Sequence, residues 1–259
     1  MKCQIEKLTA PKGQCAGKSM RVCRKIVRIL DNLIDRFLFL LCILIFLIGG
    51  YALFDSYAVY YQAADNDILK CKPGYETEED VNKEIQGFMA AWLTMDGSDI
   101  DYPVMQGDDN SEYLSKDPFG GYSLAGSIFL DSRNAPDFTD PYSLIYGHHM
   151  EHGMMFGALD EWLDRAYCDN HRTGKLIVGD DTFPLEVFAV LEAEATRKEL
   201  FAPTETDPAM TFDFIKDHAR ILYEDSVPGT DERIVALSTC KSPDTSERTI
   251  VVCRVLKND

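Results

Sequence analysis

The first strong feature of the hydrophobic pattern is a long uncharged run near the start of the chain. Residues 37–54, FLFLLCILIFLIGGYALF, contain eighteen consecutive positions without a charge. At about 1.5 Å per residue a helix of this length spans about 27 Å, close to the hydrocarbon thickness of a bilayer. A cleaved signal peptide usually has an apolar core of only about 7 to 15 residues and a small-residue cleavage site after it. The segment therefore predicts a retained transmembrane anchor.

Beyond the anchor the pattern changes to a polar connector and then to helical spacing. Residues 55–75 are polar, contain several tyrosines and include the turn signal Pro73-Gly74 in the sequence KPG, which predicts a stalk. Residues 77–93 repeat apolar side chains on one helical face. We expect an amphipathic packing helix there, at the start of a domain that occupies residues 76–259.

The remaining apolar segments are short, rich in β-branched and aromatic residues, and separated by turn residues. They lie at 100–106, 126–132, 142–149, 175–179, 182–195, 233–240 and 248–256. Seven or eight such strands predict a closed or nearly closed, mostly antiparallel β-barrel. Helical insertions are predicted at 154–164 and 207–222, the second with Asp207 as N-cap and Pro208 as the first helical residue. The predicted fold class is mostly β with helical additions.

Charge divides the chain into two unequal parts. The formal net charge is −17, which argues against a general nucleic-acid binder because phosphate backbones are held by an excess of Lys and Arg. Residues 1–36 have the opposite balance, with nine Lys or Arg against three acidic residues. Basic residues flank the cytoplasmic end of a membrane span. We therefore expect a basic cytoplasmic tail at 1–36 and an extracellular domain after the anchor.

Four of the eight cysteines fall on the predicted outer side. Cys71, Cys168, Cys240 and Cys253 are scattered over a domain of ordinary size, which does not resemble a disulfide framework. We expect no structural bridge.

Cys240 ends one predicted strand and Arg248 begins the next. Two antiparallel neighbours would bring these residues to the same end of the sheet. Nearby positive charge favours the thiolate form of a cysteine, and a guanidinium can stabilise a developing oxyanion. Considered singly, however, Cys240 also fits a small buried residue and Arg248 a solvated strand-end charge.

Three of the five histidines, His148, His149 and His152, follow the apolar run SLIY at 143–146. A zinc site built on His148 and His152 is disfavoured, because glycines bracket the segment, the Glu of an H-E-x-x-H motif is missing and no third ligand stands out. No metal site is predicted. A histidine at a strand end instead suits a general base or an imidazolium partner of a cysteine.

These motifs together resemble one family. The YGHHM segment, the LSTC strand ending and the arginine that opens the last strand are similar to the sortases, which are cysteine transpeptidases of Gram-positive bacteria. WLTMDGSDIDYPVMQGDDNSEYL and GSIFLDSRN further resemble class B sortases. The resemblance covers essentially residues 76–259 and implies an eight-stranded barrel with a helix before the first strand and a helical insertion before the cysteine strand.

The resemblance also implies roles for individual residues. Cys240 corresponds to the nucleophile, His148 to the catalytic histidine and Arg248 to the catalytic arginine, while Ser238 and Thr239 correspond to substrate-binding positions. His149 is implied to be a neighbour without a catalytic role. No cofactor is implied.

The implied reaction is a two-step acyl transfer. Cys240 would cleave a C-terminal sorting motif of a secreted protein, hold the acyl part as a thioester and pass it to an amine of a cell-wall precursor. A lysine amine of a pilin subunit is an alternative acceptor. A noncatalytic membrane-anchored β-barrel adhesin would share the fold, whereas a papain-like hydrolase places its cysteine before its histidine and does not fit.

Overall fold

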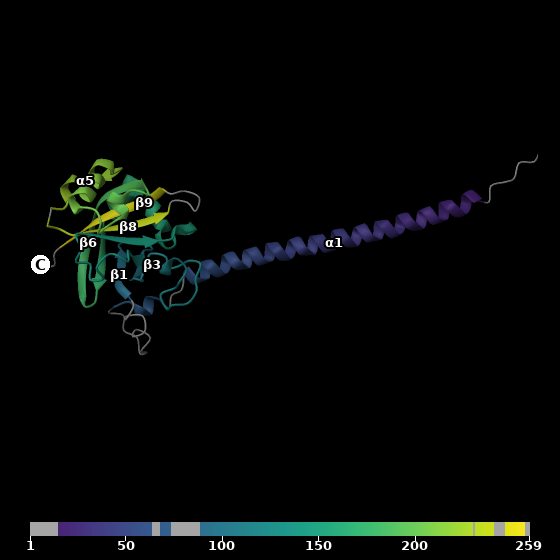
Figure 1. Cartoon of the computed structure of the whole chain (residues 1–259), viewed down its shortest axis with the longest axis horizontal. Helices are drawn as coiled ribbons and strands as arrows, with labels where there is room; N and C mark the ends of the chain where they lie inside the picture. Colours follow the sequence, from purple (N-terminus) through teal and green to yellow (C-terminus); the bar gives the residue numbers. More distant parts are fainter. Residues whose placement is uncertain (1–14, 64–67, 74–88, 230, 241–246, 257–259) are drawn as a thin grey trace, which may run out of the picture. The chain divides into compact units, whose positions relative to one another are not determined.

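The computed structural model describes residues 15–63, 68–73, 89–229, 231–240 and 247–256. The chain divides into two compact units, Met1–Tyr57 and Ala58–Asp259. The described residues of the first unit belong to the long helix α1, Cys15–Ala63, whose last residues, 58–63, are counted with the second unit (Figure 1).

Helix α1 contains the apolar run predicted from the sequence. Its part from Arg24 to Ala58 has a mean hydropathy of 2.8 over the most apolar stretch and is long and apolar enough to cross a membrane. The helix continues to Ala63, so the first part of the predicted stalk, residues 55–63, is helical. No Pro or Gly interrupts residues 55–63, so no residue there ends the helix.

The second unit includes residues that precede the predicted domain boundary at 76. The short 3-10 helix η1, Ile68–Cys71, packs against strands of the barrel. Cys71 is fully buried in a cluster with Trp92 and Met105, and Lys72 forms an ion pair with Asp101 at 2.6 Å. Residues 68–73 therefore contribute to the core of the folded unit.

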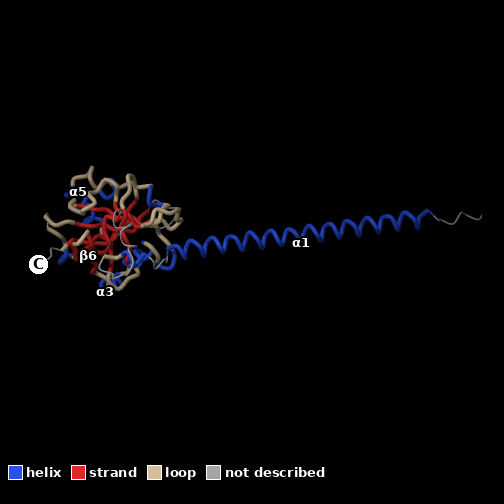
Figure 2. Tube along the Cα trace, turned by 90° about the horizontal axis from the view of Figure 1, so that it is seen from below, coloured by secondary structure: helices blue, strands red, loops and turns tan. Residues whose placement is uncertain are grey.

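Eight strands form a closed barrel, as predicted. In Figure 2 the strands, in red, gather at the centre of this unit among loops and short helices. They are β1 Met89–Met95, β2 Asp101–Met105, β3 Ile128–Leu130, β4 Tyr142–Gly147, β5 Thr173–Val178, β6 Asp181–Glu194, β8 Ile234–Cys240 and β9 Glu247–Val255. The order is β5-β1-β2-β3-β4-β8-β9-β6, and a β5–β6 pairing closes the ring. The two-residue strand β7, Ile221–Leu222, is added beside β6. Most pairs are antiparallel, but β2–β3 and β4–β8 are parallel.

Two of the predicted helices have different limits in the structure. Residues 89–93, predicted as the end of a helix, belong to β1, because pairing with β2 and β5 buries Trp92 and Leu93 completely. The rest of that predicted helix, 77–88, lies outside the described residues. The helix predicted at 207–222 ends at His218, and residues 221–222 pair as β7 instead.

Helices and turns occupy the remaining connections. They are η2 Glu112–Leu114, η3 Glu151–Gly153, η4 Phe156–Leu163, α3 Arg165–Asn170, α4 Lys198–Phe201, α5 Pro208–His218 and η5 Glu224–Ser226. Helix α5 begins as predicted, with the Asp207 side chain accepting a hydrogen bond from the Ala209 N–H and Pro208 in the first turn. The predicted insertion at 154–164 is the 3-10 helix η4.

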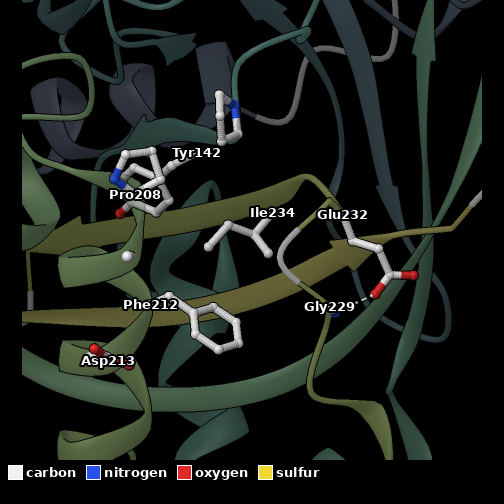
Figure 3. Close-up of a pocket in the computed structure, with 9 residues that line it drawn as sticks. Tyr142, Pro208, Phe212, Asp213, Gly229, Glu232 and Ile234 are labelled. Carbon is white, nitrogen blue, oxygen red and sulfur yellow. Dashed lines mark hydrogen bonds between the residues drawn. The ribbon is translucent and has the colours of Figure 1, made fainter.

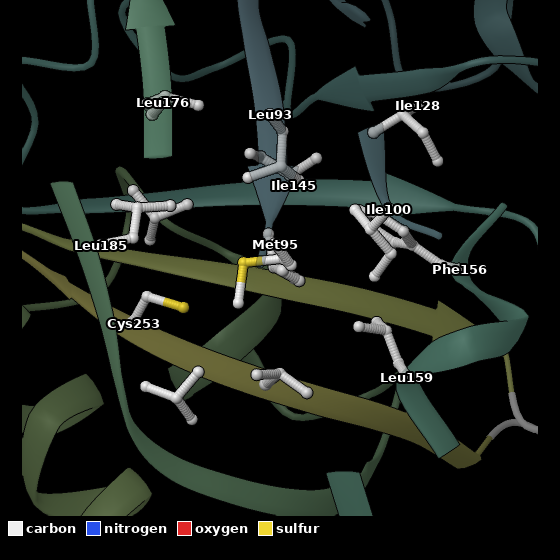
Figure 4. Close-up of a cluster of buried hydrophobic side chains, with 14 of the residues drawn as sticks. Leu93, Met95, Ile100, Ile128, Ile145, Phe156, Leu159, Leu176, Leu185 and Cys253 are labelled. Carbon is white, nitrogen blue, oxygen red and sulfur yellow. The ribbon is translucent and has the colours of Figure 1, made fainter. Parts of the chain in front are cut away.

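Besides the cluster around Cys71, the sheet separates two larger hydrophobic clusters. The larger fills the barrel with inward side chains from all eight strands, including Leu93, Ile145 and Cys253 (Figure 4). The second lies on the outer face of β4, β6, β8 and β9, where Leu200 of α4 and Ile215 of α5 pack against the sheet. Both faces of β8 are thus covered, which fixes the register of its last residues.

Candidate active site

Strand register brings His148, Cys240 and Arg248 to one end of the sheet. β8 pairs in parallel with β4, with Gly147 opposite Thr239, so His148 and Cys240 are the next residues on the two strands. β8 pairs with β9 on its other side, with Cys240 directly opposite Arg248. The three positions therefore lie side by side on adjacent strands, with Cys240 in the middle.

Strand alternation also places the three positions on one face. Leu144 of β4, Ala236 of β8 and Ile250 of β9 all belong to the outer cluster, and His148, position 240 and Arg248 have the same parity along their strands. The side chain of Cys240 lies outside the described part of the chain, so its role as nucleophile stays a prediction.

His148 is held by a backbone carbonyl that the sequence did not indicate. Its Nε2 lies 2.8 Å from the carbonyl oxygen of Leu114. A carbonyl can only accept, so Nε2 carries the hydrogen and Nδ1 is the nitrogen free to exchange a proton. Gly126 permits this approach, because a Cβ there would lie 2.7 Å from the Tyr113 carbonyl oxygen and 3.0 Å from Cδ2 of His148.

The neighbouring histidine has a different environment. His149 Nε2 lies 3.1 Å from Oδ2 of Asp160, and its backbone forms an isolated bridge with Met155. The other oxygen of Asp160 accepts a hydrogen bond of 2.7 Å from the hydroxyl of Thr249. His148 and His149 thus have different hydrogen-bond partners.

Arg248 is half-buried at the start of β9. Its Nε atom is buried and has no hydrogen-bond partner among the residues that the structure describes. A buried, unpaired donor of a guanidinium is costly unless another group accepts from it. Arg254, the other arginine of β9, lies opposite Ile234 at the far end of the strand and bonds Glu186 at 2.6 Å.

A buried network lies on the outer face of β4. The hydroxyl of Tyr146 donates to Asp131 at 3.0 Å, and Arg133 donates to both oxygens of Asp131. Burial and then the Asp131 carboxylate raise the pKa of Tyr146 well above its usual value, and the positive charge of Arg248 opposes this rise. Tyr146 is therefore within electrostatic reach of Arg248. The spacing of Asp131, Arg133 and Tyr146 in the sequence did not predict these hydrogen bonds.

The two predicted substrate-binding positions are both fully buried. Ser238 lies opposite Tyr146 and Ile250 on the outer face, and its hydroxyl has no hydrogen-bond partner among the described residues. Thr239 has the opposite parity, on the side of the barrel interior. Their predicted contact with substrate remains a prediction.

The other cysteines of the domain are buried in the core. Burial raises the pKa of the Cys253 thiol far above its usual value, and burial likewise raises the pKa of Cys168. Neither forms a disulfide. Thiols held in the neutral form are poor nucleophiles, so Cys168 and Cys253 do not compete with Cys240 for the predicted role.

A well-formed cavity of about 290 Å³ lies elsewhere. Tyr142, Phe212 and Ile234 line it, between the start of β8 and helix α5 (Figure 3). Ile234 and Cys240 are the first and last residues of β8. The cavity is therefore at the end of the strand opposite to the three candidate catalytic positions. Within the described residues, no group of three or more His, Cys, Asp or Glu could hold a metal ion.

Comparisons with known proteins agree with this architecture. A family model described as "Sortase domain" matches residues 93–256. Sortase B of Listeria monocytogenes is 34% identical over 194 residues, which cover 72% of this chain and 75% of the relative.

Solved structures give the same picture. A Streptococcus pyogenes class B sortase involved in pilus biogenesis is 36% identical with a TM-score of 0.60, over 65% of this chain and 92% of that chain. The Staphylococcus aureus sortase B–substrate complex is 26% identical with a TM-score of 0.61, over 68% and 82%. A sortase B complexed with triglycine is 26% identical with a TM-score of 0.62, over 69% and 85%. The chain therefore belongs to the sortase family and is a class B-like cysteine transpeptidase.

Proposed function

We propose that this transpeptidase cleaves a C-terminal sorting motif of secreted proteins and transfers the acyl part to an amine of a cell-wall precursor. The single observation that carries the proposal is the register of three adjacent strands, which places Cys240 between His148 and Arg248. The similarity to a sortase B solved with substrate supports the same reading.

The first step forms a thioester. The thiolate of Cys240 attacks the carbonyl carbon of the scissile peptide bond, and the guanidinium of Arg248 stabilises the negative oxygen that develops. The C–N bond then breaks, and the Nδ1–H of a His148 imidazolium protonates the leaving amine. The Leu114 carbonyl holds the Nε2–H of His148 throughout, so the ring keeps its orientation in both protonation states.

The second step reverses these roles. Neutral His148 takes a proton from the incoming amine through Nδ1, and the amine attacks the thioester carbonyl. Cys240 leaves as a thiolate and a new amide forms. Because the anchor and the basic tail would hold the enzyme with its barrel outside the cell, the secreted substrate and the wall precursor would meet it at the same membrane surface.

A lysine amine of a protein subunit is the second candidate acceptor. The observation in its favour is the 36% identity to a class B sortase involved in pilus biogenesis, which exceeds the 26% identity to the Staphylococcus aureus enzyme.

The test is a peptide screen with the full chain in detergent micelles. A library of sorting-type pentapeptides in a longer peptide is incubated alone, with triglycine, or with a lysine-containing peptide, and products are identified by mass spectrometry. We expect cleavage of one motif class and diversion of the product from free acid to amide when an amine is present. Cys240→Ala is the control and should give no product. Cleavage that yields only free acid at every amine concentration would contradict the proposed transfer.

A further inference from the structure

One carboxylate contacts the chain next to two of the three candidate catalytic residues. Asp160 lies on η4, and its Oδ2 pairs with His149, the residue after His148, at 3.1 Å. Its Oδ1 accepts from Thr249, the residue after Arg248, at 2.7 Å. Asp160 thereby links the end of β4 to the start of β9 across β8, which carries Cys240.

The contacts of Asp160 lie just beyond the last paired residues of β4 and β8. The β4–β8 ladder ends with the pair Gly147 and Thr239, so His148 is one residue beyond it. η4 replaces the missing ladder contacts. The Phe156 N–H donates to the His148 carbonyl at 3.0 Å, and Asp160, one turn later on the same helix, bonds the next residue.

Both side chains that bond Asp160 are largely buried, which restricts their motion. Thr249 is fully buried, and its hydroxyl reaches Asp160 from the face of β9 opposite to Arg248. The side chain of His149 is only 24% exposed, and that of Asp160 is 36% exposed. Hydrogen bonds to a charged acceptor are shorter and stronger than neutral ones.

We propose that Asp160 is a positioning residue for the acyl transfer, which fixes His148 and Arg248 relative to Cys240. The expected effect on the reaction rate rests on the proposed function. Asp160 acts through His149 and Thr249, on the side of the sheet away from the candidate catalytic face. Loss of its contacts should therefore lower the rate of the chemical steps and leave peptide binding unchanged, because small misplacements of reacting groups are costly to rate.

The experiment compares three variants of the full chain. Asp160→Ala removes both contacts. Asp160→Asn keeps an oxygen acceptor for Thr249 and an amide that can donate to His149. Asp164→Ala is the matched control, since Asp164 lies four residues away and its side chain accepts from the Ala166 N–H at the start of α3, not from His149 or Thr249.

For Asp160→Ala we expect kcat for peptide cleavage to fall about 10- to 100-fold with KM within about twofold of the wild type. Asp160→Asn should recover to within about fivefold of the wild type, and Asp164→Ala should keep its kcat. A kcat for Asp160→Ala within twofold of the wild type would overturn the proposal. The proposal would also be overturned if Asp164→Ala showed the same fall in kcat and the same loss of thermal stability as Asp160→Ala.

A double variant tests the link itself. If Thr249 acts through Asp160, Thr249→Val should lower kcat, and Thr249→Val with Asp160→Ala should be no slower than Asp160→Ala alone. Independent, multiplicative losses would contradict the link.

The reactivity of Cys240 can be measured without substrate. This measurement distinguishes failure of the positioning role of Asp160 from failure of the proposed function. The rate of iodoacetamide alkylation of Cys240, followed by mass spectrometry of its peptide, depends on the charges around the thiol. We expect Asp160→Ala to change this rate severalfold and Asp164→Ala to leave it unchanged. If the wild type cleaves no peptide but the alkylation rates differ in this way, the proposed function fails and the positioning role stands. Equal alkylation rates in all variants, with active wild type, would overturn the positioning role alone.

Discussion

At the residue scale, the two adjacent histidines have different hydrogen-bond partners. Nε2 of His148 bonds the Leu114 carbonyl, which leaves Nδ1 for the proposed proton transfer. Nε2 of His149 instead contacts the Asp160 carboxylate. The difference arises from the backbone at the end of β4, where consecutive side chains point to opposite faces. Only the first histidine shares the face of Arg248.

This assignment predicts unequal effects of two alanine substitutions. His148→Ala removes the proton donor and should lower kcat/KM for peptide cleavage by about 10²- to 10⁴-fold. His149→Ala removes one contact of Asp160 and should cost less than about 100-fold. Thermal unfolding should show that both variants stay within roughly 1 to 2 kcal/mol of the wild type. Full activity of His148→Ala together with inactive His149→Ala would reverse the assignment.

The sequence predicted the candidate catalytic positions but not the groups that hold them. Cys240 and Arg248 could be placed together because a strand, a loop and a strand imply a shared sheet end. The Leu114 carbonyl and Asp160 could not be found, because a backbone acceptor leaves no trace in the sequence. A single Asp within a helical insertion also looks like any solvated charge.

At the scale of elements, local patterns failed where tertiary pairing outweighed them. Residues 89–93 have helical spacing, yet β1 forms there because two neighbouring strands bury Trp92 and Leu93. Residues 221–222 leave the predicted helix to pair with β6. The remaining strands were predictable because turn residues separate short apolar runs whose length fits strands.

One ion cluster joins several of these elements. Glu186 of β6 accepts from Arg254 of β9 at 2.6 Å, from Arg172 at 2.7 Å and from the Ser226 hydroxyl at 2.9 Å. Burial acts to raise the pKa of Glu186, but the hydrogen bonds from Arg254 and Ser226 outweigh it and lower the pKa below its usual value. The charged form is therefore favoured by folding.

Glu186→Gln should destabilise the barrel by roughly 2 to 3 kcal/mol at pH 7, because two half-buried guanidinium groups lose their acceptor charge. A carboxylate with a lowered folded-state pKa stabilises the fold fully above its unfolded-state pKa, and this contribution is lost as the pH falls through the folded-state pKa. Urea unfolding at pH 7 and pH 3 should thus show a smaller difference between variant and wild type at pH 3.

The matched control for this cluster is an exposed ion pair. Glu205 is 66% exposed in its pair with Arg133, and exposed pairs contribute at most about 1 kcal/mol. Glu205→Gln should therefore change the free energy of unfolding by less than about 1 kcal/mol. An equal loss in both variants, or a difference for Glu186→Gln that does not shrink at pH 3, would contradict the role assigned to Glu186.

At the scale of the whole molecule, charge and hydropathy along the chain indicate the same orientation in a membrane. Basic residues at 1–36 precede the apolar run of α1, and an acidic barrel follows it. Lys and Arg near a membrane span are retained on the cytoplasmic side, whereas acidic residues have little influence on orientation. The basic tail therefore determines the expected topology, with the N-terminus inside and the barrel outside.

This topology is tested by proteolysis of intact protoplasts that carry the full chain with an epitope tag at each end. We expect added protease to remove the C-terminal tag and degrade the barrel while the N-terminal tag survives, because the membrane shields the first 36 residues. Permeabilised protoplasts, in which both tags should be lost, are the control for protease access. A variant with Arg24, Lys25 and Arg28 replaced by Gln should lose part of this preference, since those three charges lie nearest to the apolar run after Arg36. A C-terminal tag that survives in intact protoplasts but not in permeabilised ones would place the barrel in the cytoplasm, where it could meet neither a secreted substrate nor an external wall precursor.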